Sequence, residues 1–194
     1  MTFPETLGLI SGLFLISGYI PYTYEVIKGT DTPNRASWFI WALSTVVILI
    51  GVKETGTNEA IWVPIADAVG CFIIFILSIR FGVGGWSKTD KISLVIAISS
   101  LVIWLITGNA FVAFLMNLII YISGYISTIK KAMVNPESES LFAWTLFFIG
   151  VVLNLTTVII GTDTSFEIWL YPIVLMATVG TLYFFLIKRF LRNK

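Results

Sequence analysis

The stretch Ile16-Ser-Gly-Tyr-Ile20 recurs as Ile122-Ser-Gly-Tyr-Ile126, 106 positions further along the chain. The same register, without a gap, places Trp38 on Trp144. A slip of one or two residues then aligns three further pairs: Ile61-Trp62 with Ile168-Trp169, Pro64 with Pro172, and Arg80 with Lys188. Chance similarity between two apolar segments is the alternative, but the match runs from helix starts to interfacial tryptophans. The sequence therefore indicates two related halves.

The composition places both halves in a membrane. Of the 194 residues, 57% are apolar and 12% are charged, and the mean hydropathy is +0.94, whereas a soluble domain carries about 25% charged residues. A membrane-spanning helix needs about 20 apolar residues, so seven spans take up roughly 140 residues. The remainder provides only short tails and connections, which leaves no room for a soluble domain.

Apolar runs separated by polar residues predict seven transmembrane helices. They lie near Leu7–Tyr24, Ala36–Val52, Ala60–Ile79, Ile92–Thr107, Ala110–Ile129, Leu141–Ile160 and Ile168–Ile187. The repeat relates helices one to three to helices five to seven, so the fourth helix links two triplets of the same topology. We therefore predict an all-α transmembrane fold of 3+1+3 architecture. Residues 1–81 form the first three-helix repeat, 82–109 the linker with the fourth helix, and 110–194 the second repeat.

The positions of Lys and Arg predict the orientation. With seven spans, eleven of the twelve basic residues fall on one side, and only Lys53 falls on the other. The N-terminus is therefore expected outside and the C-terminus in the cytoplasm, in a multi-pass protein of the inner or plasma membrane. The net charge of +1 excludes nucleic acid as the main partner.

Short motifs at the predicted helix ends resemble a known family. Gly18-Tyr-Ile-Pro-Tyr22 closes the first helix, a basic loop begins at Lys28-Gly29, and Ser37-Trp38 begins the second helix. Together with the 3+1+3 arrangement, this pattern resembles the SWEET and PQ-loop transporter superfamily, and looks most like its uncharacterised bacterial seven-helix members. The resemblance covers essentially the whole chain at the level of architecture. It implies a carrier of a small polar solute that works by alternating access, with sugar as the default solute.

The chain departs from the family pattern at two places. Pro21 is followed by Tyr22, where the family often has Gln, and Ser127-Thr128 stands where the second repeat would carry the Pro-Gln pair. The resemblance therefore leaves the substrate open.

Asp67 is the one acid well inside a predicted span, about two turns from the outer end of the third helix. A carboxylate in the bilayer is expensive unless it is paired, hydrated or protonated, so such residues usually line a cavity. The functional interpretation is a substrate-binding or proton-coupling acid on the central path, and the structural one is an Asp that joins neighbouring helices. The equivalent position in the second half is Val174 or Leu175, so the predicted site is asymmetric.

Five other residues are candidates for the same solute-binding site. Asn117 and Asn154 are the next intramembrane polar groups, and an amide in hydrocarbon bonds either a neighbouring helix or a polar solute. Tyr19 and Tyr125 occupy equivalent repeat positions near the cytoplasmic ends of their helices, where they either gate the inner mouth or anchor the interface. Trp41 offers a flat face to a sugar or an aromatic ring.

Two further features concern helix ends. Pro21 removes a backbone hydrogen bond from the first helix and is a candidate hinge for a rocking carrier. The tryptophans at the helix starts are expected to form interfacial belts. Trp38 and Trp144 would lie at the inner interface, and Trp62 and Trp169 at the outer one.

The sequence predicts no enzyme. It contains no histidine, which excludes Ser-His relays and His-based metal sites, and its single cysteine, Cys71, can form neither an internal disulfide nor a Cys-only zinc site. One intramembrane acid cannot form an aspartyl dyad. We therefore expect no cofactor and no metal. A receptor, sorting protein or scaffold of the same fold is the alternative to a carrier, and the sequence leaves homo-oligomer formation undecided.

Overall fold

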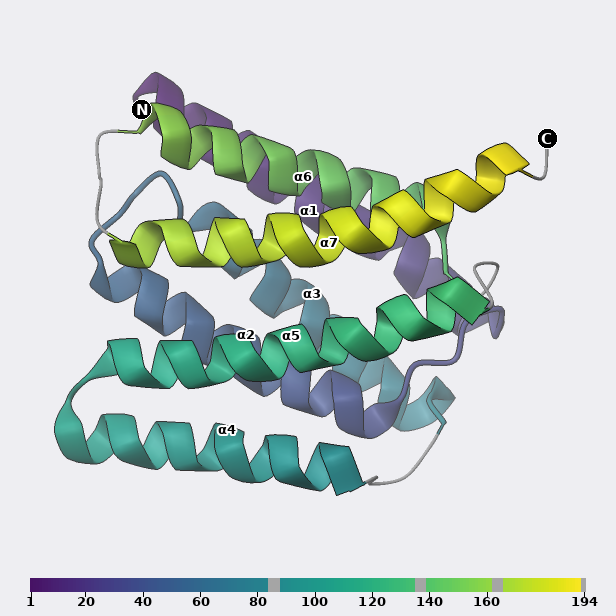
Figure 1. Ribbon diagram of the computed structural model, residues 1–194, viewed down its shortest axis with the longest axis horizontal. Helices are drawn as coiled ribbons and strands as arrows, with labels where there is room; N and C mark the ends of the chain where they lie inside the picture. The colour runs from purple at the N-terminus through teal and green to yellow at the C-terminus, as the bar shows by residue number, and fades with distance from the viewer. Residues whose placement is uncertain (84–87, 135–138, 162–165, 193–194) are drawn as a thin grey trace.

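The protein, as a computed structural model, is described over residues 1–83, 88–134, 139–161 and 166–192 and contains seven helices (Figure 1). They are α1 (Phe3–Lys28), α2 (Arg35–Glu54), α3 (Trp62–Phe81), α4 (Lys88–Thr107), α5 (Ala110–Val134), α6 (Leu141–Ile160) and α7 (Phe166–Arg192). The described ranges contain no strand and a single isolated bridge, between Asn34 and Val83. The prediction of seven helices is confirmed. Six of them contain the whole predicted span, and α3 begins two residues later than predicted. Positions 84–87 of the predicted linker lie outside the described residues.

Side-chain caps determine where several helices begin. Glu5 donates its backbone N–H to the Thr2 hydroxyl (3.3 Å) and accepts the Thr2 backbone N–H (2.7 Å), which forms a capping box for α1. Asn34 caps α2 through its Oδ1, and Ser140, 106 positions later, caps α6 through its hydroxyl. At the other end of α1, Gly29 has a φ of 74°, which terminates the helix at no steric cost.

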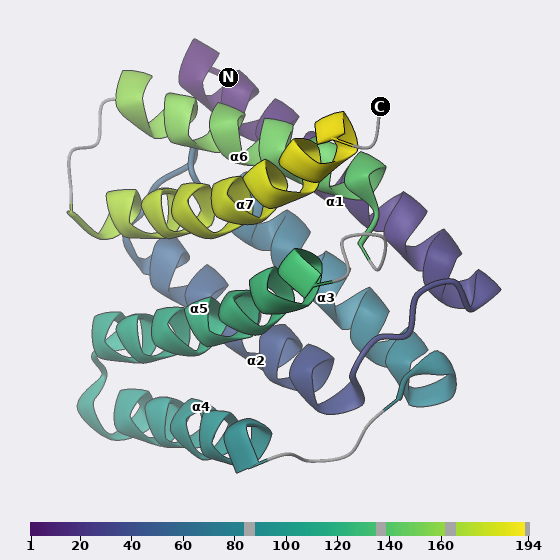
Figure 2. The same cartoon turned by 45° about the vertical axis from the view of Figure 1, so that its right-hand side comes forward.

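The helices pack in a regular order. In the first half of the chain, α3 packs against both α1 and α2; in the second half, α7 packs against both α5 and α6. The halves meet where α1 packs on α6 and α2 packs on α5, and α4 lies at the edge of the bundle against α5 and α2 (Figures 1 and 2). The two termini lie at opposite ends of the bundle (Figure 1). Five fully buried residues mark the core: Val26, Ile48, Ile74, Val151 and Leu182.

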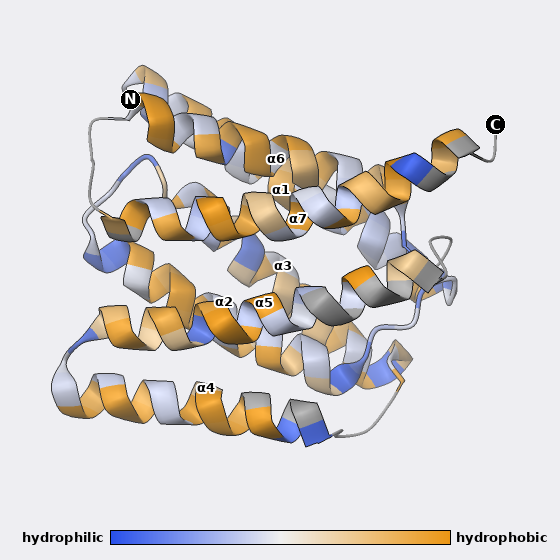
Figure 3. Cartoon of the chain, in the orientation of Figure 1, coloured by the Kyte–Doolittle hydropathy of each residue, from blue (hydrophilic) through white to orange (hydrophobic). Residues whose placement is uncertain are grey.

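The surface of the bundle suits a membrane. Five helices are long and apolar enough to cross it, namely α1, α2, α3, α6 and Ile168–Lys188 of α7. The apolar parts of α4 and α5 within the described ranges are shorter, Leu94–Thr107 and Ala110–Tyr125. Hydrophobic residues run along the helices and hydrophilic ones gather at the ends (Figure 3). Large apolar side chains also point outward, for example Leu105 of α4, which is 78% exposed. The chain thus has the helices of a multi-pass membrane protein.

Candidate functional site

A cavity of about 490 Å³ lies between the two halves of the bundle. Its walls come from α1, α2 and α3 and from α5, α6 and α7. Thr32 and Val83, which follow α1 and α3, are exposed and also line the cavity, so the cavity reaches the molecular surface at this end. Small-molecule sites occupy about 300–1,000 Å³. The cavity is therefore large enough for a small solute.

The Asp67 carboxyl group lies in the cavity wall and is 4% exposed. It accepts hydrogen bonds from three tyrosine hydroxyls on three different helices. Tyr19 of α1 donates to Oδ1 at 2.6 Å, Tyr121 of α5 donates to Oδ2 at 2.6 Å, and Tyr171 of α7 donates to Oδ2 at 2.7 Å. These lengths match those of O–H···O⁻ bonds. A single carboxyl group on α3 thus joins helices from both halves.

Two further polar groups extend this network. The Cys71 thiol, one turn after Asp67 on α3, lies 3.8 Å from Asp67 Oδ1 and 3.4 Å from the Tyr19 hydroxyl. The Tyr125 hydroxyl lies 3.5 Å from that of Tyr121. Cys71 and Tyr125 also line the cavity, so the network connects the buried carboxyl group to a wall that a solute would touch.

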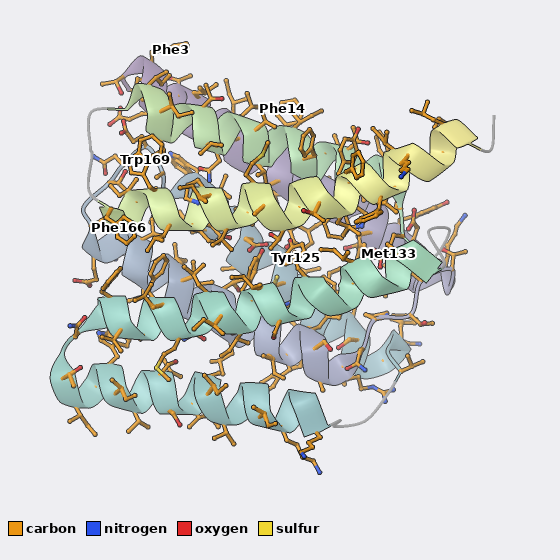
Figure 4. The ribbon with its side chains drawn as sticks, viewed as in Figure 1. Phe3, Phe14, Tyr125, Met133, Phe166 and Trp169 are labelled. Carbon is orange, nitrogen blue, oxygen red and sulfur yellow. The ribbon has the colours of Figure 1, made fainter. Side chains whose placement is uncertain are left out.

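Aromatic side chains form much of the remaining wall, and we call them the aromatic lining. Its eight members are Tyr19, Tyr22, Trp38, Trp41, Tyr121, Tyr125, Trp144 and Phe147. Six consecutive ring contacts connect seven of them, with centroid distances of 5.4 Å (Tyr22–Trp38), 5.1 Å (Trp38–Trp41), 5.7 Å (Trp41–Tyr125), 6.0 Å (Tyr125–Trp144), 5.3 Å (Trp144–Phe147) and 4.9 Å (Phe147–Tyr19). The eighth ring, Tyr121, contacts Trp41 and Tyr125. Figure 4 shows Tyr125 midway along the bundle, in the space between α5 and α7.

A second carboxyl group lies in the wall just before α6. Glu139 is 8% exposed, and its Oε2 accepts a hydrogen bond from the Trp144 indole Nε1 at 2.9 Å. This bond holds the Trp144 ring in the wall. Within the described ranges, no three His, Cys, Asp or Glu side chains lie together as a metal site would require.

The described residues at the opposite end of the bundle are tightly packed. Here α1 approaches the start of α3 and the middle of α6 so closely that only glycine fits. A Cβ added at Gly12 would lie 2.8 Å from the Trp62 carbonyl oxygen, and one added at Gly150 would lie 2.9 Å from the Ser11 carbonyl oxygen. The cavity therefore reaches one end of the bundle and stops short of the other.

The structure brings four of the six predicted solute-binding residues to one cavity: Asp67, Tyr19, Tyr125 and Trp41. Asn117 and Asn154 lie outside its described wall. Asn117 donates to the Ser100 hydroxyl of α4 (2.6 Å) and to the Ala113 carbonyl (2.8 Å), so it joins α5 to α4. The amide of Asn154 is buried, with no hydrogen-bond partner among the described residues.

The structure also differs from the expected tryptophan belts. Trp38 and Trp144 are 9% and 6% exposed and line the cavity, whereas a residue of an interfacial belt would face the lipid headgroups. They turn inward because Trp38 packs on Tyr22 and Trp41, and Trp144 bonds to Glu139.

At the candidate hinge, α1 continues unbroken through Pro21. The side chain of Ser127, the position compared with it in the second half, lies outside the described residues.

Sequence reasoning missed several wall residues, although two of them carried a signal. Tyr121 lies four residues before Tyr125 and Phe147 lies three after Trp144, which places each pair on one helical face. Tyr171, which bonds to Asp67 but is not among the described wall residues, carried no such signal, because its contact with Asp67 spans 104 positions.

Comparison of the chain with protein-family models, with curated proteins and with solved structures finds no match. The cavity and its wall are therefore the basis for proposing a function.

Proposed function

We propose that the chain is a membrane carrier that moves a small polar solute by alternating access, with its central site at Asp67. The observation that carries the proposal is the cavity between the halves, which reaches one end of the bundle, closes at the other and contains a buried acid. A carrier that rocks between two states exposes such a site to one side at a time.

The wall supports the repeat on which this mechanism depends. At the offset of 106, six pairs of equivalent residues line the cavity, among them Tyr19 with Tyr125, Trp38 with Trp144, and Trp41 with Phe147. At the offset of 108 that aligns Pro64 with Pro172, Asp67 pairs with Leu175, and both line the cavity. We propose on this basis a parallel 3+1+3 repeat of the SWEET and PQ-loop type. The proposed orientation has the N-terminus outside and the C-terminus cytoplasmic, so that the cavity faces the cytoplasm.

Asp67 offers a route to proton coupling. An ionised carboxylate only accepts hydrogen bonds, and it can take all three tyrosine bonds at once. A protonated carboxyl group must donate one bond, so one tyrosine hydroxyl has to turn its own proton elsewhere. Because the three tyrosines belong to α1, α5 and α7, protonation changes the contacts between helices of the two halves. We propose this change as the link between proton and solute.

The test uses Cys71, the only cysteine, as a natural blocking site. Purified protein in liposomes is assayed for counterflow of sugars, amino acids and amines at two pH values. A methanethiosulfonate reagent is then added, which forms a disulfide with the Cys71 thiolate and releases a sulfinate. The proposal predicts counterflow of at least one solute and its loss after modification, whereas the reagent should not change the counterflow that the Cys71→Ser variant shows. Solute binding without any flux would overturn the carrier and favour a receptor.

A further inference from the structure

The Asp67 carboxyl group lies in the described wall of the cavity, and the described residues of that wall include no Lys or Arg. The three tyrosine hydroxyls that contact Asp67 contribute dipoles but no net positive charge. A buried carboxylate is costly to leave without a counter-ion. A cationic solute would supply that charge.

The aromatic lining suits a particular kind of cation. Ring faces carry partial negative charge, and an alkylated ammonium group within about 6 Å of several ring centroids is attracted to each of them. Here the ring contacts run from Tyr22 of α1 around to Tyr19 of the same helix, through α2, α5 and α6. Rings from both halves therefore line the cavity whose wall contains Asp67, and aromatic rings are what the cages that bind quaternary ammonium groups are built from.

The polar groups of the wall are poorly suited to a sugar. A sugar carries several hydroxyls, and each is costly to bury without a hydrogen-bond partner. The Ser123 and Thr128 hydroxyls already donate to carbonyls of their own helix, and the Asn34 Oδ1 already caps α2. The intramembrane amides Asn117 and Asn154 lie outside the described wall. Three polar groups of the wall are therefore already bonded within the protein, which leaves them fewer hydrogen bonds to offer a sugar.

We infer that the solute of this cavity is an organic cation with an alkylated ammonium or a similarly delocalised charge, held by the aromatic lining with Asp67 as the counter-charge. This inference rests on the proposed carrier function and specifies its substrate class. It replaces the sugar that the family resemblance implies by default.

The decisive comparison uses two probes of the same shape. Choline carries a trimethylammonium group, and 3,3-dimethylbutan-1-ol carries an uncharged tert-butyl group in its place. Binding of both to the purified wild-type protein is measured by calorimetry and by the shift in unfolding temperature, with tetramethylammonium, N-methylpyridinium and glucose alongside. We expect at least one of the three cations to bind, and choline to bind at least about ten-fold more tightly than its neutral analogue.

Variants then locate the site. Trp41→Leu removes one ring of the aromatic lining, and Trp169→Leu removes a partly buried ring outside the cavity as a matched control. We expect Trp41→Leu to weaken cation binding by about ten-fold or more and Trp169→Leu to leave it unchanged. Asp67→Asn should weaken binding of the cations and leave that of 3,3-dimethylbutan-1-ol unaltered.

The outcomes separate this inference from the carrier proposal, because binding and flux are measured independently. Cation binding without flux supports the cation site and overturns the carrier. Flux of a sugar or another neutral solute without cation binding overturns the cation site and leaves the carrier intact. Equal affinity for choline and its neutral analogue, or no binding of any of the three cations, also overturns the inference.

Discussion

Asp67 shows how one side chain can influence several helices. Its two oxygens are used unequally, because Oδ1 accepts from Tyr19 of α1 whereas Oδ2 accepts from both Tyr121 of α5 and Tyr171 of α7. A proton on Oδ2 therefore affects contacts with the second half of the chain. A proton on Oδ1 affects a contact within the first half.

Replacement of Asp67 by Asn tests the coupling role. Asn cannot gain or lose a proton at this position, so we expect accumulation driven by a pH gradient to be abolished. Exchange of labelled for unlabelled solute needs no net proton movement and should persist at saturating solute. Both quantities are measured in proteoliposomes.

Tyr171→Phe is the matched control, because it removes one hydrogen bond and keeps the carboxyl group. It should retain pH-driven accumulation. Loss of exchange in Asp67→Asn at every solute concentration, in protein that is still folded, would contradict a role limited to coupling.

Asn117 illustrates the structural use of an intramembrane amide. Its bond to the Ser100 hydroxyl joins α5 to α4 at the edge of the bundle. We expect Asn117→Ala to lower the free energy of unfolding by about 0.6–1.7 kcal/mol, the usual range for such bonds in a membrane, and to leave solute binding unchanged. Denaturant titration of the purified protein measures the first quantity.

A double-mutant cycle with Ser100→Ala should show that the two losses are not additive. The Thr181→Val variant removes a hydroxyl that bonds only within its own helix, and it should have a smaller effect. A ten-fold loss of solute affinity in Asn117→Ala would place this residue in the binding site after all.

At the scale of the helix, small residues determine how closely two helices can approach each other. Gly8 and Gly12 lie on one face of α1 against the start of α3, and Gly150 of α6 lies against the α1 backbone. The neighbouring atoms are backbone atoms, so they cannot turn aside as a flexible side chain could. This packing closes the end of the bundle that the cavity does not reach.

Gly150→Ala should therefore destabilise the protein. The added methyl group would lie 2.9 Å from both Leu15 N and the Ser11 carbonyl oxygen, which forces α1 and α6 apart. We expect a loss of about 1–3 kcal/mol, typical of overpacking, seen as a lower unfolding temperature in detergent. Gly180→Ala is the control, because its nearest neighbour, Phe148 Cε2, would lie 3.7 Å away. Equal stability of the two variants would contradict the close approach.

The sequence predicted the helices well and their mutual contacts poorly. Hydropathy and spacing identified all seven helices, because each apolar run has to be helical in a membrane. Five of the helices are longer than predicted, since polar ends such as Lys28 of α1 remain helical beyond the apolar part, whereas α3 and α6 have the predicted length. Asp67 could be selected from the sequence as a candidate site residue, because a charge deep inside a membrane span is costly.

The partners of Asp67 and of the two amides could not be predicted, because they depend on which faces meet in the folded bundle. Asn117 faces α4, whereas Tyr121, four residues later, reaches Asp67 on α3. The spacing of residues along α5 does not indicate that Asn117 contacts α4 whereas Tyr121 contacts α3.

For the whole molecule, the proposed orientation determines which side can reach the cavity. The surface-exposed cavity residues Thr32 and Val83 lie in connections that are cytoplasmic in the proposed orientation. Cys71, the only cysteine, lies deeper in the same wall beside Asp67.

Modification of Cys71 should therefore depend on side and on charge. We expect a membrane-impermeant trimethylammonium methanethiosulfonate to react from the cytoplasmic side, and faster than a sulfonate of the same reactive group, because Asp67 and Glu139 attract the cation. Mass spectrometry after labelling of inside-out and right-side-out vesicles measures both effects.

Asp67→Asn should reduce the preference for the cationic reagent, whereas Trp169→Leu should not alter it. Faster labelling from the outside would reverse the proposed orientation of the cavity.

The Asp67 network also constrains biosynthesis. Asp67 emerges from the ribosome well before its last partner, because Tyr171 is 104 residues further on. At roughly 5–20 residues per second, this interval lasts about 5–20 s. Tyr19 is already made when the interval begins, and Tyr121 follows about halfway through it, 54 residues after Asp67. Until Tyr171 is made, the carboxyl group on the nascent third helix therefore lacks at least one of its three hydrogen-bond donors. Chains truncated before α7 should therefore be recognised by membrane insertion factors and quality-control proteases as incomplete.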